Sequence, residues 1–388
     1  MSKLFLAALL GVMVINCEAS SQNVSSVGAA TNISHFRAGN APGFIVIDDF
    51  NRDGKPDIAA ANEQSNNVTI LLGNGTGNFT EAKGSPFPAG HAPNDIAVSD
   101  FNADGKWDLA FANHEEKHLT VLLGDGTGAF SPAPKSPFAA EVRPHTHGVS
   151  AGDLNGDGRA DLITDSWGND RIAILFGDGT GDFKQPAKFL TVGKHPYQRV
   201  RAADINGDKK ADIIVTNLDG DNVSIFLSDG KGNFTQPTGS PFACGDSPFF
   251  AAVGDLNKDG KPDLAVVNAP GSTSDRRGTN GLTILLGDGA GNFKIMNGSP
   301  FVTGKVPNLL AIGDVNNDGV NDVAATYFDD NCIALFLMND KTGVSSNSTI
   351  PVGKHPKGIA ISDLNGDGKA DIVVAENGDN DVAIIWGK

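Results

Sequence analysis

The chain has 388 residues, of which 39% are hydrophobic and 20% charged, and it contains 48 Gly, 20 Pro and 22 Phe. This composition is typical of a globular protein rich in turns and excludes an intrinsically disordered chain. The formal net charge of −16 excludes a nucleic-acid-binding protein, because phosphate binding requires a basic surface.

Residues 1–19 have the pattern of a secretory signal. Lys3 precedes the apolar run LFLAALLGVMVI, and NCEA follows it, which is the order of charged, hydrophobic and cleavage regions. The run is too short to span a bilayer, so we expect no transmembrane span. Two kinds of processing stay open: cleavage after Ala19, or lipidation at Cys17, for which the preceding Asn16 is unfavourable. We expect a secreted or cell-surface protein, with residues 20–30 as a flexible linker.

Seven copies of a nonapeptide, DxNxDxxxD, divide the rest of the chain into repeats. Successive copies start 51, 53, 51, 51, 59 and 49 residues apart, the first at Asp49 and the last at Asp363. An apolar strand leads into each copy and another leads out. A third strand follows a polar turn, and a glycine-rich turn with Phe, such as GDGTGAF, opens a fourth. Four short strands in about fifty residues are typical of a propeller blade.

The two ends of the repeat region complement each other. The last repeat stops at VAIIWGK without a fourth strand, and the N-terminal stretch TNISHFRAG supplies a strand without a blade. Pairing the two would remove an exposed sheet edge. We therefore predict that residues 31–388 form an all-β, seven-bladed β-propeller of four-stranded blades. Its ring is closed by residues 33–38, which complete the last blade.

The nonapeptide carries the chemistry of a calcium loop. Asp, Asn, Asp and Asp at positions 1, 3, 5 and 9 offer the hard oxygen ligands that Ca²⁺ prefers, and the carbonyl of position 7 can add another. Position 2 is always apolar and is expected to face the core, and Gly at position 6 permits a positive φ. The alternative is that these segments are hairpin turns without metal. The presence of all four ligand positions in all seven copies argues against this alternative. The predicted ligands of up to seven Ca²⁺ ions are Asp49, Asn51, Asp53, Asp57, Asp100, Asn102, Asp104, Asp108, Asp153, Asn155, Asp157, Asp161, Asp204, Asn206, Asp208, Asp212, Asp255, Asn257, Asp259, Asp263, Asp314, Asn316, Asp318, Asp322, Asp363, Asn365, Asp367 and Asp371.

The fourth copy differs from the others at position 6, where Lys209 replaces glycine. A Cβ atom at positive φ costs about 1–2 kcal/mol, and the ammonium group would repel the ion. We expect the site that begins at Asp204 to be the weakest of the seven.

A second set of residues is expected on the face opposite the Asp loops. There the segments before the first strand and between the second and third strands emerge, and in the third and fourth repeats they carry His145, His147, Trp167, Tyr197 and Arg199. Aromatic rings beside hydrogen-bonding groups suit sugars, and arginine suits carboxylates. We predict a ligand site from these five residues. The alternative is that they are ordinary polar loop residues.

Two further segments belong to this face. The insertion at residues 269–281 is a second candidate contact loop. The string HEEKH at residues 114–118 matches the zinc-protease motif HExxH, which requires a helix to bring its two histidines to one side. Alignment on the repeat puts this string in a turn between two strands, so we predict no protease.

The DxNxDGxxD loops, the GxGxxF turns and the Gly-x-x-Pro segments resemble those of the FG-GAP/VCBS repeat family, whose best-known members are the integrin α-subunit propellers. The resemblance covers residues 31–388. It implies calcium at the Asp loops of a lower face and ligand binding on the opposite face. Similar propellers serve as adhesion heads, lectins and, in some cases, polysaccharide lyases. This chain departs from integrins in carrying the motif in all seven blades, without leg domains or a membrane span.

These observations favour a monomeric calcium-binding module for a glycan or a cell-surface protein, acting without catalysis. The alternative is a calcium-stabilised lyase that acts on an acidic polysaccharide. In that case Arg199 would neutralise a carboxylate, and His145, His147 or Tyr197 would act as base or acid.

Overall fold

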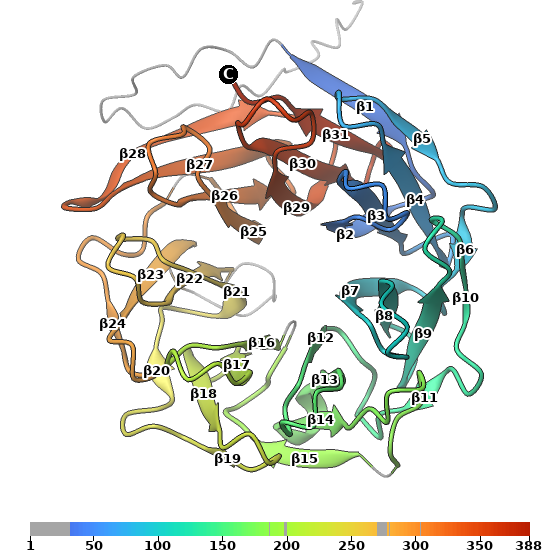
Figure 1. The fold of residues 1–388 in the computed structure, drawn as a ribbon. Coiled ribbons are helices and arrows are strands. Elements are labelled where there is room, and N and C mark those ends of the chain that lie inside the picture. The colour runs from blue at the N-terminus through green and yellow to red at the C-terminus, as the bar shows by residue number, and fades with distance from the viewer. Residues whose placement is uncertain (1–31, 186, 198–199, 270–277, 279, 303) are drawn as a thin grey trace, which may run out of the picture.

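The computed structural model describes residues 32–388 apart from 186, 198–199, 270–277, 279 and 303. Its strands form seven antiparallel sheets arranged in a ring (Figure 1). Within these residues the one helical element is the 3₁₀ helix η1 (Trp167–Asn169), and no helix there could cross a membrane. The predicted seven-bladed β-propeller is confirmed.

Six blades follow the chain directly, and each runs from a strand near the centre of the ring to a strand at its rim (Figure 1). They comprise β2 (Pro42–Asp48), β3 (Asp57–Asn62), β4 (Asn67–Gly73) and β5 (Phe79–Glu81); β7 (Pro93–Ser99), β8 (Asp108–Asn113), β9 (His118–Gly124) and β10 (Phe130–Pro132); β12 (Val149–Gly152), β13 (Asp161–Ser166), β14 (Arg171–Leu175) and β15 (Lys188–Thr191); β16 (Arg201–Ala203), β17 (Asp212–Asn217), β18 (Asn222–Ser228) and β19 (Phe234–Thr235); β21 (Pro248–Gly254), β22 (Asp263–Asn268), β23 (Gly281–Gly287) and β24 (Phe293–Ile295); β25 (Pro307–Gly313), β26 (Asp322–Tyr327), β27 (Cys332–Asn339) and β28 (Gly343–Pro351). Three short strands, β6 (Phe87–Pro88), β11 (Phe138–Ala139) and β20 (Phe242–Ala243), pair with the third strands of their blades.

The seventh blade joins the two ends of the repeat region. Its order is β29 (Pro356–Ser362), β30 (Asp371–Glu376), β31 (Asp381–Ile385) and then β1 (Ile33–Arg37). Strand β1 pairs antiparallel with β31, with Ile33 opposite Ile385, and the N–H of Ala38 donates to the carbonyl of Asn380 at 3.1 Å. The predicted closure of the ring is therefore confirmed, and it gives the last blade four strands.

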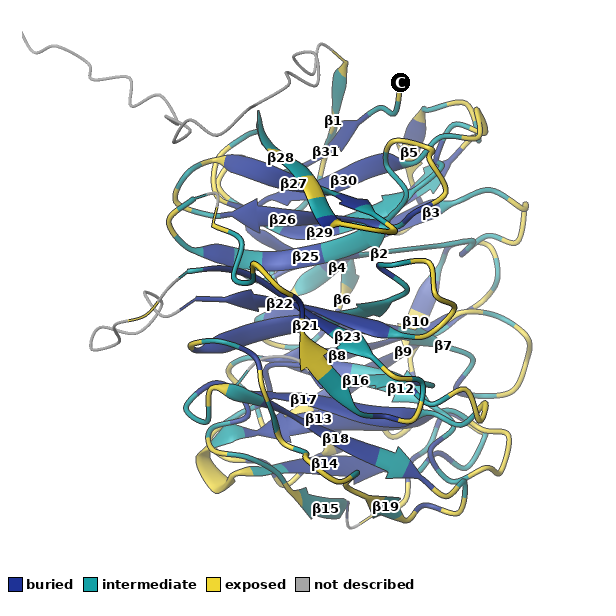
Figure 2. Ribbon diagram, turned by 90° about the vertical axis from the view of Figure 1, so that its left-hand side faces the viewer, coloured by how far each residue is buried: buried dark blue, intermediate teal, exposed yellow. Residues whose placement is uncertain are grey.

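The second strand of every blade is buried along its whole length (Figure 2). In β3, for example, the residues from Ile58 to Ala61 have no exposed surface. Both faces of a propeller sheet pack against neighbouring sheets, so such a strand is apolar on both sides rather than alternating. The core consists of apolar layers between adjacent blades, as in the cluster that Val68 of β4 shares with Leu109 of β8.

The apolar residue at position 2 of an Asp loop ties neighbouring blades together. Phe50 packs edge-on against Phe130 from the glycine-rich turn of the next blade, with 5.8 Å between ring centroids, and Phe101 packs against Phe183 in the same way at 5.7 Å. Six of the seven position-2 residues are buried, as predicted, while Val315 is half-buried. The loops are thereby held at fixed places on the ring.

Strand direction separates two faces. The Asp loops join first to second strands, and the glycine-rich turns follow third strands, so both emerge at one end of each sheet, which we call the lower face. The entry segments before first strands and the turns between second and third strands emerge at the other end, which we call the upper face. Asp loops and histidine-rich segments therefore lie on opposite faces, as predicted.

Candidate functional site

On the lower face, each Asp loop is folded around its own backbone N–H groups. In the first loop the carboxylate of Asp49 accepts from the N–H of Asp53 at 3.0 Å and of Gly54 at 2.8 Å. Asn51 Oδ1 also accepts from Asp53, at 2.9 Å, and Asp53 Oδ1 accepts from Lys55 at 3.0 Å. The same contacts recur in the second and fifth loops. These bonds orient the oxygens of positions 1, 3 and 5.

The aspartate at position 9 has a different environment. Asp57 is fully buried; its Oδ2 accepts from the N–H groups of Phe50 and Asn51, and its Oδ1 accepts from Gly73 at the end of β4 at 2.7 Å. Burial raises the pKa of this carboxyl to about 6, and that of Asp161 in the third loop to about 7. Position 9 therefore connects the loop to the third strand, a structural role that the motif alone does not reveal.

The donor set of the loops fits calcium. It contains only carboxylate, amide and carbonyl oxygens, and each carboxylate oxygen that accepts one N–H keeps a second lone pair for a cation. A cation would also compensate the burial that disfavours the charged form of position 9. The side chains that would hold Ca²⁺ are the predicted ones at positions 1, 3, 5 and 9, and calcium at these loops stays a prediction.

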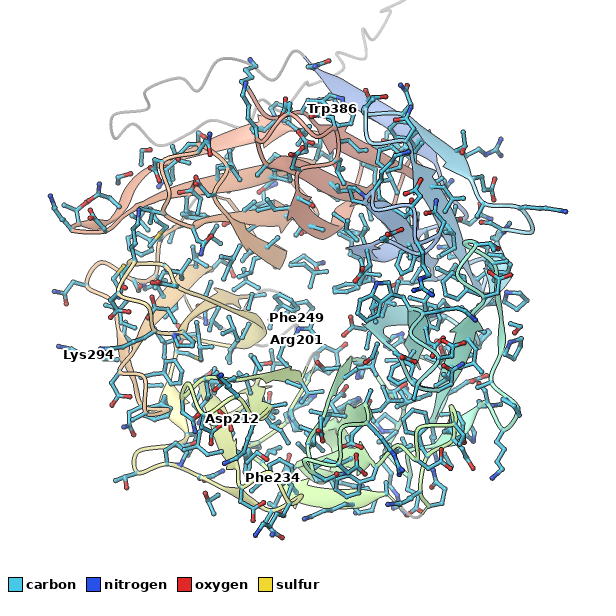
Figure 3. All side chains as sticks on the ribbon, in the orientation of Figure 1. Arg201, Asp212, Phe234, Phe249, Lys294 and Trp386 are labelled. Atoms are coloured by element: carbon cyan, nitrogen blue, oxygen red, sulfur yellow. The ribbon has the colours of Figure 1, made fainter. Side chains whose placement is uncertain are left out.

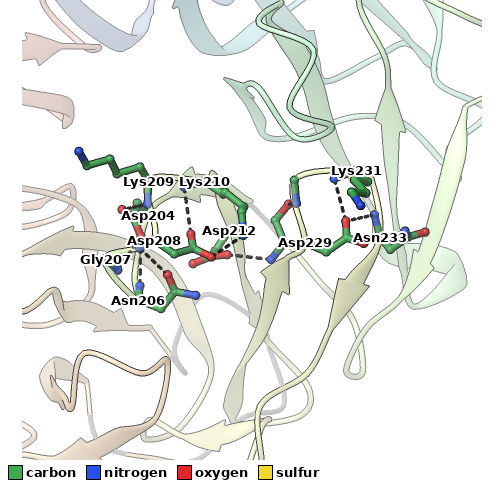
Figure 4. Close-up of polar contacts among 12 residues, drawn as sticks. Asp204, Asn206, Gly207, Asp208, Lys209, Lys210, Asp212, Asp229, Lys231 and Asn233 are labelled. Atoms are coloured by element: carbon green, nitrogen blue, oxygen red, sulfur yellow. Dashed lines mark hydrogen bonds and ion pairs between the residues drawn. The ribbon is translucent and has the colours of Figure 1, made fainter.

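The fourth loop has the strained position that the sequence predicts (Figure 4). Lys209 has φ of 65°, close to the 77° of Gly260 at the same position of the fifth loop. Its N–H still donates to Asp204 Oδ2 at 2.7 Å, so the loop keeps its shape despite the Cβ. The neighbouring Lys210 pairs with Asp208 at 2.9 Å, which adds a second ammonium beside the loop.

On the upper face, three histidines from two blades lie together. His114 follows β8, and His145 and His147 precede β12. Their ring centroids are 4.6–4.7 Å apart, and one ring nitrogen of each lies within 4.8 Å of the others. His145 Nε2 and His147 Nε2 are 3.1 Å apart. His147 is fully buried, whereas the other two rings are half-buried, so this histidine cluster opens toward solvent on one side.

Asp165 of β13 holds His147 in place. Its Oδ2 lies 3.2 Å from His147 Nδ1, and its Oδ1 accepts from the N–H groups of His147 at 3.1 Å and Gly148 at 2.7 Å. Both side chains are buried. A carboxylate on Nδ1 leaves Nε2 of the neutral ring as the acceptor. Since Nε2 is the atom that faces His145, the cluster presents a lone pair inward.

The charge state of the cluster follows from its burial. Burial, together with the neighbouring His147 and His145, lowers the pKa of His114 to about 4. The pKa of His145 is also lowered, chiefly by burial. The rings of His114 and His145 are therefore neutral at pH 7, and each has one unprotonated nitrogen.

An aromatic wall flanks the histidine cluster. Trp167, in η1, stacks on His195 with 4.6 Å between centroids and 23° between planes. Tyr197 packs against His147 at 4.4 Å and against Trp167 at 5.8 Å. The indole N–H of Trp167 is buried and has no hydrogen-bond acceptor among the described residues. These rings from the third and fourth blades form one surface beside His145.

A polar network continues from the cluster toward the first and seventh blades. The side-chain amide of Asn94 donates to the carbonyl of His147 at 3.2 Å and accepts from Lys357 at 3.3 Å. Lys357 also pairs with Glu63. Arg201, at the inner edge of the fourth blade (Figure 3), instead pairs with Asp95 of the second blade at 3.3 Å.

Four of the five predicted ligand residues are brought together: His145, His147, Trp167 and Tyr197. Arg199 lies outside the described residues, as does most of the insertion at residues 269–281. His114, Asp165 and His195 complete the site but were not among the predicted ligand residues. Asp165 could have been found by aligning the second strands, where the same position holds Ala61, Ala112, Thr216, Val267, Thr326 and Ala375.

The string HEEKH does not form a helix, as predicted, since its first residue follows β8 and its last begins β9. His118 is exposed and takes no part in the histidine cluster. His114 nevertheless belongs to a potential metal-binding group, but its partners come from the following blade.

A second group with metal-ligating atoms lies where the ring closes. His35 Nδ1 of β1 is 3.2 Å from Glu376 and 3.3 Å from Asp381. Burial, followed by the contact with Asp381, raises the pKa of Glu376 to about 7. This group links the N-terminal strand to β30 and β31.

Solved structures with the same fold have varied functions. A lectin from Agrocybe aegerita that recognises non-reducing terminal N-acetylglucosamine is 19% identical, with 80% of each chain covered and a TM-score of 0.54. A periplasmic gluconolactonase from Pseudomonas aeruginosa is 17% identical over 86% of this chain and 88% of that one, with a TM-score of 0.58. Virginiamycin B lyase from Staphylococcus aureus is 14% identical over 91% and 98%, with a TM-score of 0.56. At these identities the likeness shows the fold alone.

The repeats themselves give a closer assignment. No curated protein matches the sequence. The FG-GAP-like repeat model matches residues 49–111, 100–164, 204–266 and 314–374, and the FG-GAP repeat model matches residues 248–285. These matches cover more than half of the chain and include all seven Asp loops in full. With its repeats in seven closed blades, the chain belongs to the FG-GAP repeat family.

Proposed function

We propose that this protein is a secreted, calcium-stabilised propeller that binds a carbohydrate, free or on a cell surface, on its upper face. The observation that carries the proposal is the aromatic wall of Trp167, His195 and Tyr197 beside the histidine cluster. The propeller fold is compatible with such a binding role, and FG-GAP repeats are typical of extracellular proteins.

The aromatic wall has the chemistry that sugar recognition requires. The half-buried rings of Trp167 and Tyr197 offer apolar surface for the C–H face of a sugar ring. His145, whose ring centroid lies 6.2 Å from that of Trp167, supplies a polar group beside this surface. A few directed polar groups on an aromatic surface fix the orientation of a small ligand.

Calcium on the lower face would increase the free energy of unfolding of the propeller. If each loop binds with a Kd of about 10⁻⁴ M, as extracellular modules do, millimolar calcium contributes roughly 1.4 kcal/mol per loop and about 10 kcal/mol over seven loops. Seven divalent ions would also bring the formal net charge of −16 close to neutrality. The ligand would then bind to a ring that calcium keeps rigid.

The test is a glycan array probed with the calcium-loaded protein, followed by titration calorimetry with the best glycan. We expect Trp167→Ala to weaken binding by roughly tenfold, about 1.4 kcal/mol. The matched control is Trp107→Ala, because Trp107 is 39% exposed and belongs to the second Asp loop on the lower face. Equal losses in the two variants, or binding to no glycan, would contradict the proposal.

A lyase is the second candidate, because the cluster that contains the neutral rings of His114 and His145 packs against the ring of Tyr197 through His147. In β-elimination, one such nitrogen would remove the proton next to a uronic acid carboxylate while the C–O bond to the leaving sugar breaks, and an acid such as Tyr197 would protonate that oxygen. Incubation with acidic glycans, followed by the ultraviolet absorbance of unsaturated products, separates this activity from binding. New absorbance that His145→Ala abolishes would favour the lyase over the binding module.

A further inference from the structure

We propose that His114, His145 and His147 form a binding site for one divalent transition-metal ion, with Zn²⁺ as the best match. The basis is the convergence of one ring nitrogen from each histidine within 4.8 Å of the other two. This proposal stands on the geometry of the cluster and holds whether or not a glycan binds to the adjacent aromatic wall.

The spacing of the rings is close to that of a zinc site. With Zn–N bonds of about 2.0–2.1 Å in a tetrahedral arrangement, two ligating nitrogens lie about 3.3 Å apart. His145 Nε2 and His147 Nε2 are 3.1 Å apart, and the centroids of all three rings are separated by nearly equal distances of 4.6, 4.6 and 4.7 Å. Small side-chain rotations would bring the third nitrogen to the same distance, since His114 is only half-buried.

The structure also contains a carboxylate that would orient one of the metal-ligating histidines. Metal-ligating histidines usually donate their other N–H to a carboxylate, which fixes the ring and raises its basicity. Asp165 Oδ2 occupies this place, 3.2 Å from His147 Nδ1. Asp165 is itself held by two backbone N–H groups and is 1% exposed. The other blades have Ala, Val or Thr at the aligned position of the second strand, and this positioning role explains the buried acid in the third blade.

Rigid backbone supports the three ligands. Thr146, between two of them, is fully buried, and its hydroxyl joins the entry segment of the third blade to the end of β8 by accepting from the N–H of Asn113 at 2.8 Å. His114 directly follows Asn113. The two segments that carry the ligands are therefore fastened to each other independently of any ion.

The chemistry of the donors selects the metal. A ligand set of three imidazole nitrogens, with no carboxylate oxygen bound to the metal, suits Zn²⁺, Co²⁺, Ni²⁺ or Cu²⁺, whereas Ca²⁺ and Mg²⁺ require oxygen ligands. The upper-face site would thus exclude the ion proposed for the lower face. Three protein ligands leave at least one coordination position for water or for a ligand atom. The site would then be open rather than purely structural.

The test measures metal binding by the full chain in millimolar calcium, which occupies the oxygen sites. After removal of transition metals, Zn²⁺ is titrated by calorimetry, and Co²⁺ is added to record its ligand-field absorption. We expect one Zn²⁺ per chain and a Co²⁺ spectrum typical of nitrogen ligands. His114→Ala and His145→Ala should each lower the affinity for Zn²⁺ at least a hundredfold, because each removes one of three ligands.

Two further variants distinguish Zn²⁺ binding at the histidine cluster from nonspecific Zn²⁺ binding at the protein surface. His118→Ala is the matched control, since His118 is exposed and belongs to the same turn as His114; its affinity should equal that of the parent. Asp165→Asn should weaken binding by 10–100-fold and alter the Co²⁺ spectrum without removing a ligand. Melting curves in calcium confirm that each variant is folded.

Three results would overturn the proposal: no Zn²⁺ binding by the folded parent, equal binding by the parent and His145→Ala, or an equal loss in His118→Ala. The first would leave the cluster as a group of histidines joined by ring contacts and a hydrogen bond. Loss of Zn²⁺ binding in His145→Ala together with retained binding in Trp167→Ala would support the proposal, and it would do so even if the glycan proposal failed.

Discussion

On the lower face, Asp loops from different blades repeat the same hydrogen bonds. On the upper face, the histidine cluster takes one residue from the second blade and two from the third, and the aromatic wall beside it comes from the third and fourth blades. The lower-face loops resemble one another because each closes its own hairpin and anchors it to its own third strand. The upper-face segments also repeat a hydrogen bond, as where the N–H of Ala92 donates to Asn66 Oδ1 and that of His195 donates to Asp170 Oδ1, but the side chains around it differ from blade to blade. The repeated contacts thus hold the ring together, and the blade-specific side chains provide the proposed ligand site.

Removal of calcium should separate the two faces most strongly. Chelation should lower the free energy of unfolding by about 10 kcal/mol, because seven oxygen sites lose their ions together. Calorimetric melting with calcium, with chelator and with magnesium alone measures this effect. A melting temperature that does not depend on calcium would show that the lower-face loops are hairpin turns without calcium. The two faces would then not differ as two kinds of ion site.

A single buried aspartate of the lower face should have the next largest effect. Asp161→Ala leaves the N–H groups of Leu154 and Gly177 without their carboxylate, and each buried unsatisfied donor costs about 1–3 kcal/mol. We expect a loss of about 3 kcal/mol in chemical denaturation, even without calcium. The exposed Asp157→Ala in the same loop is the control and should matter only when calcium is present. Equal effects without calcium would contradict the structural role of position 9.

The closure of the ring should respond to pH through Glu376. Its pKa is raised from 4.5 to about 7 in the folded protein, so the folded state holds the proton more tightly than the unfolded state. The stability that this proton contributes is complete below about pH 4.5 and is lost as pH rises through 7. We expect Glu376→Gln, which resembles the protonated form, to gain stability relative to the parent as pH rises. Denaturation at several pH values tests this.

The control for that measurement is Asp379→Asn, because Asp379 is exposed near the same turn. A stability difference between parent and Glu376→Gln that stays constant from pH 4 to pH 8, or that has the same pH dependence as Asp379→Asn, would show that Glu376 does not couple closure to protonation.

The smallest expected effect concerns variation within the lower face. Lys209→Gly removes a Cβ at φ of 65° and should stabilise the protein by about 1 kcal/mol, while raising the calcium affinity of the fourth loop. The reverse change, Gly260→Lys in the fifth loop, should destabilise by a similar amount. Thermal melts of both variants, with and without calcium, check this. If both changes are neutral, the loops tolerate position 6 more freely than the backbone angles indicate.

The sequence was sufficient for the ring and for the conformation of the loops. Seven copies of the motif at spacings of 49–59 residues imply seven blades. The missing last strand implies closure by residues 33–38, and the positive φ at position 6, including that of Lys209, follows from the motif. These features are local or repeated, so an interpretation made for one repeat applies to the equivalent positions of the other repeats. Positive φ at position 4, as at Arg52 and Lys258, was not predicted because those residues vary.

The upper-face site was only partly predictable, for a physical reason. Its members lie far apart in the sequence and meet because neighbouring blades present equivalent positions side by side. His114, in the turn after β8, was grouped with a sequence motif in its own blade, whereas its contacts are with the entry segment of the next blade. Asp165 lies within a strand and is distinguished only when the second strands of the repeats are aligned. Only the packing of two blades reveals that these residues form one group.

The pairing of β1 with β31 has a consequence for synthesis of the chain. Ser34 and Trp386, which are joined by a hydrogen bond of 2.9 Å, are 352 residues apart in sequence. During translation, the first strand therefore has no partner until the last blade has been made, and the apolar faces of the first and sixth blades that pack against the seventh stay uncovered meanwhile. The ring can close only after residue 385 has left the ribosome, which makes completion of the chain the step that closes the fold.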